Sequence, residues 1–394
     1  MRWSGTLPPG QCEPAMARVA LELQPCCGVR SGIGTYTYEL ARRLHSGNGI
    51  EFQGNVFNFL SRNDNRTALA GISIPLSECR AMPYGVYRRV WHSVPIYYNR
   101  LFSHADLSLF FNYIVPPRIK GKAAAAVYDL TYLRFPETME RRNYRRISRD
   151  LAYSIDRSQR IITISSFVGR ELHELLAVPA EKICVVPCAP SFGGGTVPFS
   201  EITAKYGIAT PYLLYVGTIE PRKNLIRLIR AFERLKRETR IPHRLVLAGG
   251  NGWNNQEIYR AAEASAFTED IVFTGFVSAA EKNTLYQNAA VFVFPSLYEG
   301  FGMPPLEAMH FGCPVVTSHA ASLPEVVGDA ACLTDPMDEL SMADGIFQVL
   351  HDMPYRTALT AAGYIQEKKF TWDASADRLT QMCCELLGED GATK

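Results

Sequence analysis

The stretch that decides the fold is "FPSLYEGFGMPPLEAMHFGCPVVTS", which runs from Phe294 to Ser318. It joins an apolar, strand-like run to a glycine turn, two prolines that suit the first turn of a helix, a helical segment and a second apolar run. This order predicts a β-α-β unit with a parallel sheet. Two glutamates lie eight positions apart at its mouth, Glu299 in the loop and Glu307 in or near the first turn of the helix.

The rest of the chain repeats this alternation of strand and helix. Strands are expected over 17–23, 106–112, 123–130, 160–165, 182–187, 212–217, 244–249, 270–275, 289–296 and 314–318. Helices are expected over 35–44, 141–158, 224–235, 278–289 and 304–312, and Ser278 with Glu281 forms a capping box. Parallel sheets bind ligands beyond the carboxyl ends of their strands. The loops that follow strands are therefore the candidate sites: 28–34, 217–224, 249–254, 275–278 and 296–305.

The chain of 394 residues is too long for a single core, so two domains are expected. A turn-rich segment over 188–201, with three glycines and two prolines, is interpreted as the linker. The predicted division is an amino-terminal domain over 1–195 and a carboxyl-terminal domain over 196–370. A last helix within 371–394 is expected to pack back towards the first domain.

The composition excludes several classes of protein. The net charge of +2 gives no general signature of polyanion binding, and no nucleic-acid-binding module is present. No apolar run is long enough to span a membrane, and the first fifteen residues have the composition of an irregular tail without the apolar core of a signal peptide. The ten cysteines lack zinc-ligand spacing, which favours reduced thiols in a cytoplasmic protein.

Arg222 and Lys223 precede the apolar stripe of the predicted helix over 224–235. Cations at a helix N-terminus are unfavourable because they oppose the helix dipole. Their presence is better explained if an anion such as phosphate binds there. A solvated surface pair is the alternative. Glu299 and Glu307 can hold vicinal hydroxyls, and both a ribose and a hexose would suit such a pair. For Glu307, a favourable place near a helix N-terminus is the alternative explanation.

Taken together, these motifs resemble a known family. "EGFGMPPLE" matches the Glu-x7-Glu signature of family 4 of the retaining glycosyltransferases, which have the GT-B architecture. "VGTIEPRKN" resembles its diphosphate-binding loop, "SGIGTYTYEL" its first glycine loop, and "VYDLTYLRFPE", "RIITISSFVGREL" and "ICVVPCAP" match in family order. The similarity is strongest to bacterial enzymes that build surface polysaccharides, among them mannosyltransferases. It implies an α/β fold of two Rossmann-like domains whose parallel sheets face each other across a deep cleft.

The resemblance also implies roles for individual residues. Glu307 would hold the nucleotide ribose, Glu299 would contact the donor sugar, and Arg222 with Lys223 would neutralise the leaving diphosphate, so that neither a metal nor a cofactor is needed. Asp129 and Tyr128 would lie at the reaction centre, where many relatives have His-Asp. Tyrosine is a poor base at neutral pH, because its unperturbed pKa is about 10. The remaining donor-binding residues implied are Gly32, Gly34, Phe276, Val277, Gly300, Phe301 and Gly302.

Thr218 is a second departure, since some relatives have arginine there, which leaves Arg222 and Lys223 with more of the phosphate charge. No carboxylate is evidently placed as a nucleophile. The leaving diphosphate can itself take the acceptor's proton on the same face of the sugar, while the protein supplies positioning and electrostatics.

The stretch 81–160 holds fourteen Lys and Arg against six Asp and Glu, with aromatic residues interleaved in "YGVYRRVWHSVPIYYNRLF". Basic and aromatic residues together suit an anionic membrane surface, on which relatives meet lipid-linked acceptors. The alternative is an ordinary basic face whose aromatic residues lie in the core.

The sequence therefore predicts a retaining, metal-independent hexosyltransferase, with mannose from GDP-mannose as the expected donor and a polysaccharide or lipid-linked saccharide as the acceptor. It would be cytoplasmic, with possible peripheral contact to the inner face of the cytoplasmic membrane. Two alternatives stay open: a nucleotide-sugar epimerase or sugar phosphorylase, and a catalytically weak nucleotide-binding subunit.

Overall fold

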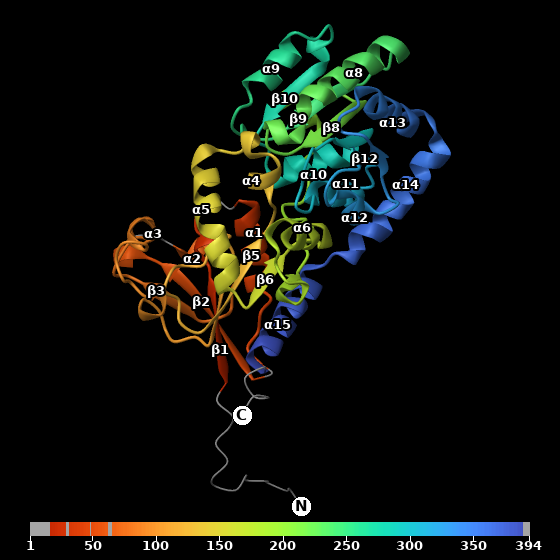
Figure 1. The fold of residues 1–394 in the computed structure, drawn as a ribbon. Helices are drawn as coiled ribbons and strands as arrows, with labels where there is room; N and C mark the ends of the chain where they lie inside the picture. Colours follow the sequence, from red (N-terminus) through yellow and green to blue (C-terminus); the bar gives the residue numbers. More distant parts are fainter. Residues whose placement is uncertain (1–15, 29–30, 48, 62–64, 389–394) are drawn as a thin grey trace, which may run out of the picture. The chain divides into compact units, whose positions relative to one another are not determined.

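The structure is a computed structural model that describes residues 16–28, 31–47, 49–61 and 65–388 (Figure 1). The predicted irregular tail over 1–15 lies outside these residues. The described part of the chain divides into two compact units. Unit 1 takes its residues from 1–126, 151–162 and 376–394, and unit 2 from 127–150 and 163–375. The domain limits predicted from the sequence stay a prediction.

The first sheet has seven strands in the order β3-β2-β1-β4-β5-β6-β7. Its strands are β1 Ala17–Glu22, β2 Ile50–Phe57, β3 Leu76–Cys79, β4 Leu107–Phe110, β5 Lys122–Val127, β6 Arg160–Thr163 and β7 Ile183–Val185. Strand β1 pairs in parallel with both β2 and β4, so the strand order reverses between β1 and β4. Strands β1, β4 and β5 read as buried apolar runs, because both faces of a parallel sheet are covered.

The second sheet, in unit 2, has six strands in the order β10-β9-β8-β11-β12-β13. These are β8 Tyr212–Val216, β9 Arg244–Ala248, β10 Ile271–Gly275, β11 Val291–Phe294, β12 Val315–Ser318 and β13 Cys332–Thr334. All five neighbouring pairs are parallel. This is the doubly wound Rossmann order, whose reversal point lies between β8 and β11. The expectation of two parallel, Rossmann-like α/β sheets is confirmed.

Helices cover the sheets. They are α1 Gly32–Ala41, α2 Asn65–Ala68, α3 Tyr84–Val90, α4 Thr131–Arg134, α5 Arg141–Arg157, α6 Ser166–Leu176, α7 Phe199–Tyr206, α8 Leu225–Thr239, α9 Gln256–Glu263, α10 Ala279–Asn288, α11 Met303–His310, α12 Leu323–Val327, α13 Glu339–His351, α14 Met353–Gln366 and α15 Trp372–Gly388. Within unit 2, α8 packs against α9 and α13, while α10 packs against α7 and α11. The predicted capping box at Ser278 and Glu281 opens α10 and is confirmed.

The aromatic residues of the basic stretch mostly lie inside unit 1. Tyr87, Trp91 and Tyr98 are buried, and the Tyr87 ring stacks on Phe57 at a centroid distance of 5.1 Å. The hypothesis that these three side chains insert into a membrane is therefore wrong, because they are core residues. Their apolar surface is already removed from water by their neighbours.

Candidate active site

The candidate site lies at the reversal point of the second sheet, where the loops after β8 and β11 are neighbours because their strands pair. The first loop carries Glu220, Arg222 and Lys223, and the second carries Glu299. Buried apolar strands fix where both loops start, since every residue of β8 and β11 is buried. Two loops 76 positions apart in the sequence thus meet at one edge of the sheet.

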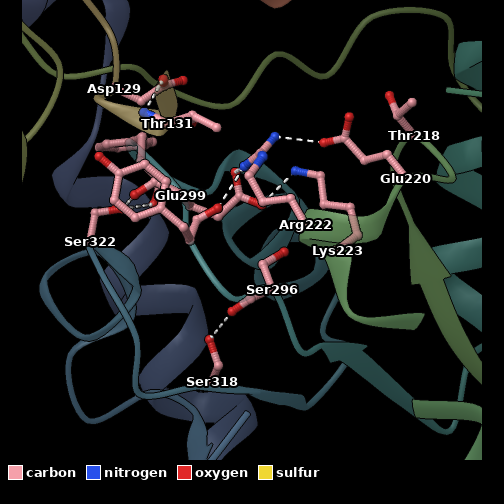
Figure 2. Close-up of polar contacts among 12 residues, drawn as sticks. Asp129, Thr131, Thr218, Glu220, Arg222, Lys223, Ser296, Glu299, Ser318 and Ser322 are labelled. Atoms are coloured by element: carbon pink, nitrogen blue, oxygen red, sulfur yellow. Dashed lines mark hydrogen bonds and ion pairs between the residues drawn. The ribbon is translucent and has the colours of Figure 1, made fainter. Parts of the chain in front are cut away.

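Glu299 is the centre of a network of ion pairs (Figure 2). Its Oε1 lies 2.5 Å from Nζ of Lys223, and its Oε2 lies 3.0 Å from Nη1 of Arg222. The other guanidinium nitrogen, Nη2, lies 2.8 Å from Oε1 of Glu220. We call Glu220, Arg222, Lys223 and Glu299 the charge cluster. Both predicted phosphate-binding cations are therefore paired with carboxylates, and the solvated surface pair considered from the sequence is wrong because Lys223 is buried.

Burial and the neighbouring charges act against each other on the pKa values of the cluster. Burial by itself raises the pKa of Glu299, but the charges of Lys223 and Arg222 lower it by more. The net effect is a pKa lowered from 4.5 to about 2. Burial and the charge of Arg222 lower the pKa of Lys223, although Glu299 and Glu220 partly offset them. Burial also lowers the pKa of Arg222, but Glu299, Glu220 and Asp129 raise it above its ordinary value. Glu299 is consequently a carboxylate at neutral pH and can only accept hydrogen bonds.

Glu220 was missed from the sequence. Its side chain is 2% exposed, Oε1 accepts from Arg222, and Oε2 is buried without a hydrogen-bond partner among the described residues. A carboxylate two positions before an arginine in the same loop was a usable signal, because it can turn the guanidinium towards the sheet edge. Arg222 thus has a carboxylate on each side, which fixes the plane of its guanidinium group.

Glu307 is held by a second pair of residues that the sequence did not reveal. It is the fifth residue of α11, directly after the first turn, so the predicted placement near that turn is confirmed. Its Oε1 lies 2.6 Å from Nζ of Lys282, and its Oε2 accepts from the hydroxyl of Tyr286 at 3.1 Å. Lys282 and Tyr286 are four residues apart on α10, so they project from one face of that helix.

The carbonyl oxygens of the loop between β11 and α11 accept hydrogen bonds from neighbouring side chains. Ser165 Oγ donates to the carbonyl of Gly300 at 2.7 Å, and Arg222 Nη1 donates to that of Tyr298 at 2.6 Å. The hydroxyl of Ser322 lies 2.8 Å from the carbonyl oxygens of both Glu299 and Phe301. The amides of Gly300, Phe301 and Gly302 donate no hydrogen bond to any described residue. Peptide N–H groups are thus left to meet an oxygen-rich ligand.

Gly300 and Gly302 are required by the backbone of this loop. A Cβ atom on Gly300 would lie 1.9 Å from the carbonyl oxygen of Tyr128, so no other residue fits there. Gly302 has φ of +101° and caps α11, in a conformation that favours glycine. The close approach of Gly300 brings the loop against Tyr128 and Asp129.

Asp129 accepts a hydrogen bond from the amide of Thr131 at 3.0 Å, which fixes its carboxylate at the start of α4 (Figure 2). Its charge also contributes to the raised pKa of Arg222. Tyr128 is buried. Asp129, Tyr128 and Glu299, the three predicted catalytic residues, therefore come together in unit 2, although 170 positions of sequence separate the first from the last.

The remaining predicted donor-binding residues fall into two groups. In unit 2, Phe276 follows β10 and is 82% exposed, while the adjacent Val277 is buried, so only Phe276 offers its side chain to a ligand. In unit 1, Gly32 and Gly34 open α1, whose N-cap Ser31 accepts from the amide of Gly34 at 3.4 Å. That all four contact the donor stays a prediction.

The residues that the structure describes contain no group of three or more His, Cys, Asp and Glu side chains that could hold a metal ion. None of their helices is both long and apolar enough to cross a membrane.

Comparison with known proteins gives concordant results. Residues 30–189 match the family model "Glycosyltransferase Family 4", and residues 199–366 match "Glycosyl transferases group 1". The chain is 32% identical over 362 residues to O-antigen chain mannosyltransferase B of Escherichia coli, covering 87% of this chain and 93% of that relative. Among solved structures, it resembles sucrose-phosphate synthase from Thermosynechococcus elongatus, with a TM-score of 0.71 and 18% identity over 95% of this chain and 100% of the other. It also resembles Anabaena HepE in complex with UDP-glucose, with a TM-score of 0.69 and 17% identity over 93% and 99% of the two chains.

The two doubly wound sheets, the charge cluster and the glycine loop define the class of this protein as a glycosyltransferase of the GT-B architecture. Both halves of the chain match models of this class, and one relative is similar over nearly its whole length. The chain belongs to Glycosyltransferase Family 4.

Proposed function

We propose that the protein is a mannosyltransferase that moves mannose from GDP-mannose to a saccharide acceptor of the O-antigen type, polymeric or lipid-linked, with retention of the anomeric configuration and without a metal ion. The observation that carries this proposal is the charge cluster around Glu299, which the amides of Gly300, Phe301 and Gly302 follow in the same loop without donating to any described residue. The identity to the Escherichia coli O-antigen mannosyltransferase supports the sugar and the acceptor class.

The donor would bind with its diphosphate at the loop after β8 and its sugar at the loop after β11. Arg222 and Lys223 supply positive charge to the diphosphate, and Glu299 accepts hydrogen bonds from the sugar hydroxyls. Glu307, oriented by Lys282 and Tyr286, accepts from the ribose hydroxyls. The three amides add hydrogen bonds to sugar or phosphate oxygens, as preorganised dipoles that need no rearrangement during the reaction.

In the transfer step, the bond between the anomeric carbon and the phosphate oxygen breaks while the acceptor hydroxyl bonds to the same face of that carbon. The proton of the acceptor passes to the departing phosphate oxygen, so the charges balance without a protein base. Glu299 is held by Lys223 and Arg222 and has a pKa of about 2, which makes it a weak nucleophile suited to binding hydroxyl groups. Arg222 and Lys223 stabilise the charge that grows on the leaving group.

The alternatives make different demands on the site. A nucleotide-sugar epimerase needs its own acid and base, and Glu299, with both oxygens occupied by cations, suits neither role. A catalytically weak nucleotide-binding subunit would need the cations and Glu307 for the nucleotide, but it would have no need of Glu299, which is assigned to the sugar hydroxyls.

The test is the release of nucleoside diphosphate from GDP-, UDP-, ADP- and dTDP-sugars, with and without an O-antigen-type oligosaccharide acceptor. Acceptor-dependent release from GDP-mannose, with an axial anomeric bond in the product by NMR, is the expected result. Two outcomes would contradict the proposal: release of nucleoside diphosphate without transfer of the sugar, and interconversion of the nucleotide-sugar into another one. Transfer from another donor would retain the enzyme class and overturn the donor.

Contact with an anionic membrane surface is part of the proposal, and its basis is α5. Arg141, Arg142 and Arg145 are exposed at the start of this helix, and none of the three forms an ion pair with a described residue. Tyr144, between them, is 39% exposed. Each such cation near an anionic surface contributes about 1 kcal/mol. With the aromatic residues of 81–100 mostly in the core, the attraction would be mainly electrostatic.

A further inference from the structure

A buried hydroxyl group joins two distant segments of unit 2. The hydroxyl of Tyr298 accepts a hydrogen bond from the amide of Leu130 at 2.9 Å, across 168 positions of sequence. The same hydroxyl donates to Oε2 of Glu171 at 2.5 Å, and Oε1 of Glu171 accepts from Nε of Arg134 at 2.6 Å. We call Leu130, Tyr298, Glu171 and Arg134 the Tyr298 bridge.

The two central side chains of the bridge are buried and packed. Tyr298 is 3% exposed and Glu171 is 2% exposed, so no water competes for their hydrogen bonds. The Tyr298 ring packs against Phe135 and Phe167, with centroid distances of 5.7 and 5.9 Å. The hydroxyl therefore cannot swing to another partner without moving a packed ring.

The direction of the hydrogen bonds is also fixed. Burial, together with the negative charges of Asp129 and Glu171, raises the pKa of Tyr298 well above its ordinary value. The hydroxyl therefore holds its proton at neutral pH. It must then donate to Glu171 and accept from Leu130, so the chain of hydrogen bonds has one polarity.

Two members of the bridge adjoin residues of the candidate site. Tyr298 immediately precedes Glu299, and Leu130 immediately follows Asp129. The contact of Gly300 with the Tyr128 carbonyl lies beside them. One hydroxyl group thus ties the loop that holds Glu299 to the segment that holds Asp129.

We propose that Tyr298 and Glu171 are positioning residues for the transfer reaction, which set the separation between Glu299 and Asp129 without touching the substrate. This inference rests on the proposed function. A displacement of about 1 Å between reacting groups costs up to about 100-fold in rate, even when its cause lies outside the reaction centre. The bridge accordingly acts on turnover, whereas donor affinity depends on Glu307, Lys282 and the cations.

The test replaces Tyr298 by phenylalanine, which removes one oxygen atom and keeps the ring. Tyr298→Phe is expected to lower kcat about 10- to 100-fold and to change the KM for the donor less than about 3-fold. The matched control is Tyr212→Phe, because the buried hydroxyl of Tyr212 donates to the carbonyl of Leu285 at 2.7 Å from the opposite, amino end of β8. It removes the same atom from the core of the same unit and should leave kcat unchanged.

A double mutant separates positioning from general damage. Once the hydroxyl is gone, Glu171→Gln can break only the ion pair with Arg134, which does not involve the loop that holds Glu299. The Tyr298→Phe/Glu171→Gln double mutant should therefore be slower than Tyr298→Phe by less than about 2-fold. The proposal would be overturned if the losses of kcat in the two single mutants multiplied in the double mutant. An unchanged kcat in Tyr298→Phe would also overturn it.

Hydrogen exchange tests the structural link between the two segments without an enzyme assay. In Tyr298→Phe, and not in Tyr212→Phe, the amides of Leu130 and Leu297 should exchange at least about 10-fold faster, because the hydrogen bond that links their two segments is lost. In the wild type, Leu130 donates to Tyr298 and Leu297 donates to the carbonyl of Arg222, both at 2.9 Å. Unchanged exchange in both segments would refute the bridge. If the wild-type protein transfers no sugar but shows this linked exchange, the proposed function fails while the structural link stands.

Discussion

Replacement of Glu299 by glutamine tests the charge cluster most directly. Glutamine keeps the size of the side chain but removes the charge that Lys223 and Arg222 contact at 2.5 and 3.0 Å. Lowering the pKa from 4.5 to about 2 corresponds to about 3 kcal/mol of stabilisation of the ionised form at neutral pH. We therefore expect Glu299→Gln to lower the free energy of unfolding by up to about 3 kcal/mol, and Tm by several degrees.

Function should change in a different direction from stability. Without the carboxylate, Arg222 and Lys223 lose a competitor for the diphosphate, so the affinity for GDP should stay the same or rise. Turnover should fall by about 100-fold or more, because the acceptor of the sugar hydroxyl bonds is lost in the transition state. Isothermal titration of GDP and initial rates of transfer measure the two quantities. Equal losses of GDP affinity and turnover would refute the reasoning.

The matched control is Glu339→Gln, which breaks an exposed ion pair between Glu339 and Arg230 in the same unit. Its stability should change by less than about 1 kcal/mol, and its activity should not change. The pH dependence supplies a second check on Glu299. Since its folded pKa lies below its unfolded value, its contribution is complete above about pH 4.5 and is lost as the pH falls towards 2. The difference in Tm between the wild type and Glu299→Gln should shrink over that range.

Three further outcomes are expected. Glu307→Ala should weaken donor binding by about 1–3 kcal/mol, with a smaller effect on kcat, as measured by titration and initial rates; a loss confined to kcat would contradict its assignment to the ribose. Activity should survive EDTA without restoration by added magnesium or manganese, and a metal-dependent recovery would count against Arg222 and Lys223 as the charges on the leaving group. Arg141→Glu with Arg142→Glu should reduce sedimentation with anionic vesicles at low salt and leave transfer to a soluble acceptor unchanged, whereas a wild type that does not sediment would refute membrane contact.

Most strands of the fold could be predicted from the sequence because parallel strands are continuous apolar runs. The run over 289–296 contains β11, and the run over 212–217 contains β8. Strand β2 was missed because Gln53 and Asn55 interrupt its apolar pattern. Strand β13 was missed because Cys332–Thr334 contains one β-branched residue, whereas the equally short β7 lies in a run that contains Ile183, Val185 and Val186. Both are recognisable only from their partners, since β2 pairs with β1 and β13 with β12.

The sequence predicted which residues belong to the candidate site, but not which of them form ion pairs and hydrogen bonds with one another. The spacing of Glu299 and Glu307, and the cations before α8, indicated which loops are expected to bind the donor. Their pairing depends on which strands are neighbours, which the strand order alone decides. Lys282 reaches Glu307 from a different helix, and no local pattern in the sequence encodes that contact.

The pairing changes how the site is expected to work. Arg222 and Lys223 carry two positive charges, and Glu220 and Glu299 carry two negative charges, so the cluster is neutral before the donor binds. In the free protein, pairing with the carboxylates avoids the cost of burying unpaired cations. A diphosphate would therefore compete with these carboxylates for cations that are already in place. On the proposed function, we expect sugar hydroxyls that bind Glu299 to weaken its hold on Lys223 and Arg222, so that these cations become available to the departing phosphate. The charge that stabilises the leaving group would in this way be linked to the presence of the sugar, which would tie donor recognition to the transfer step.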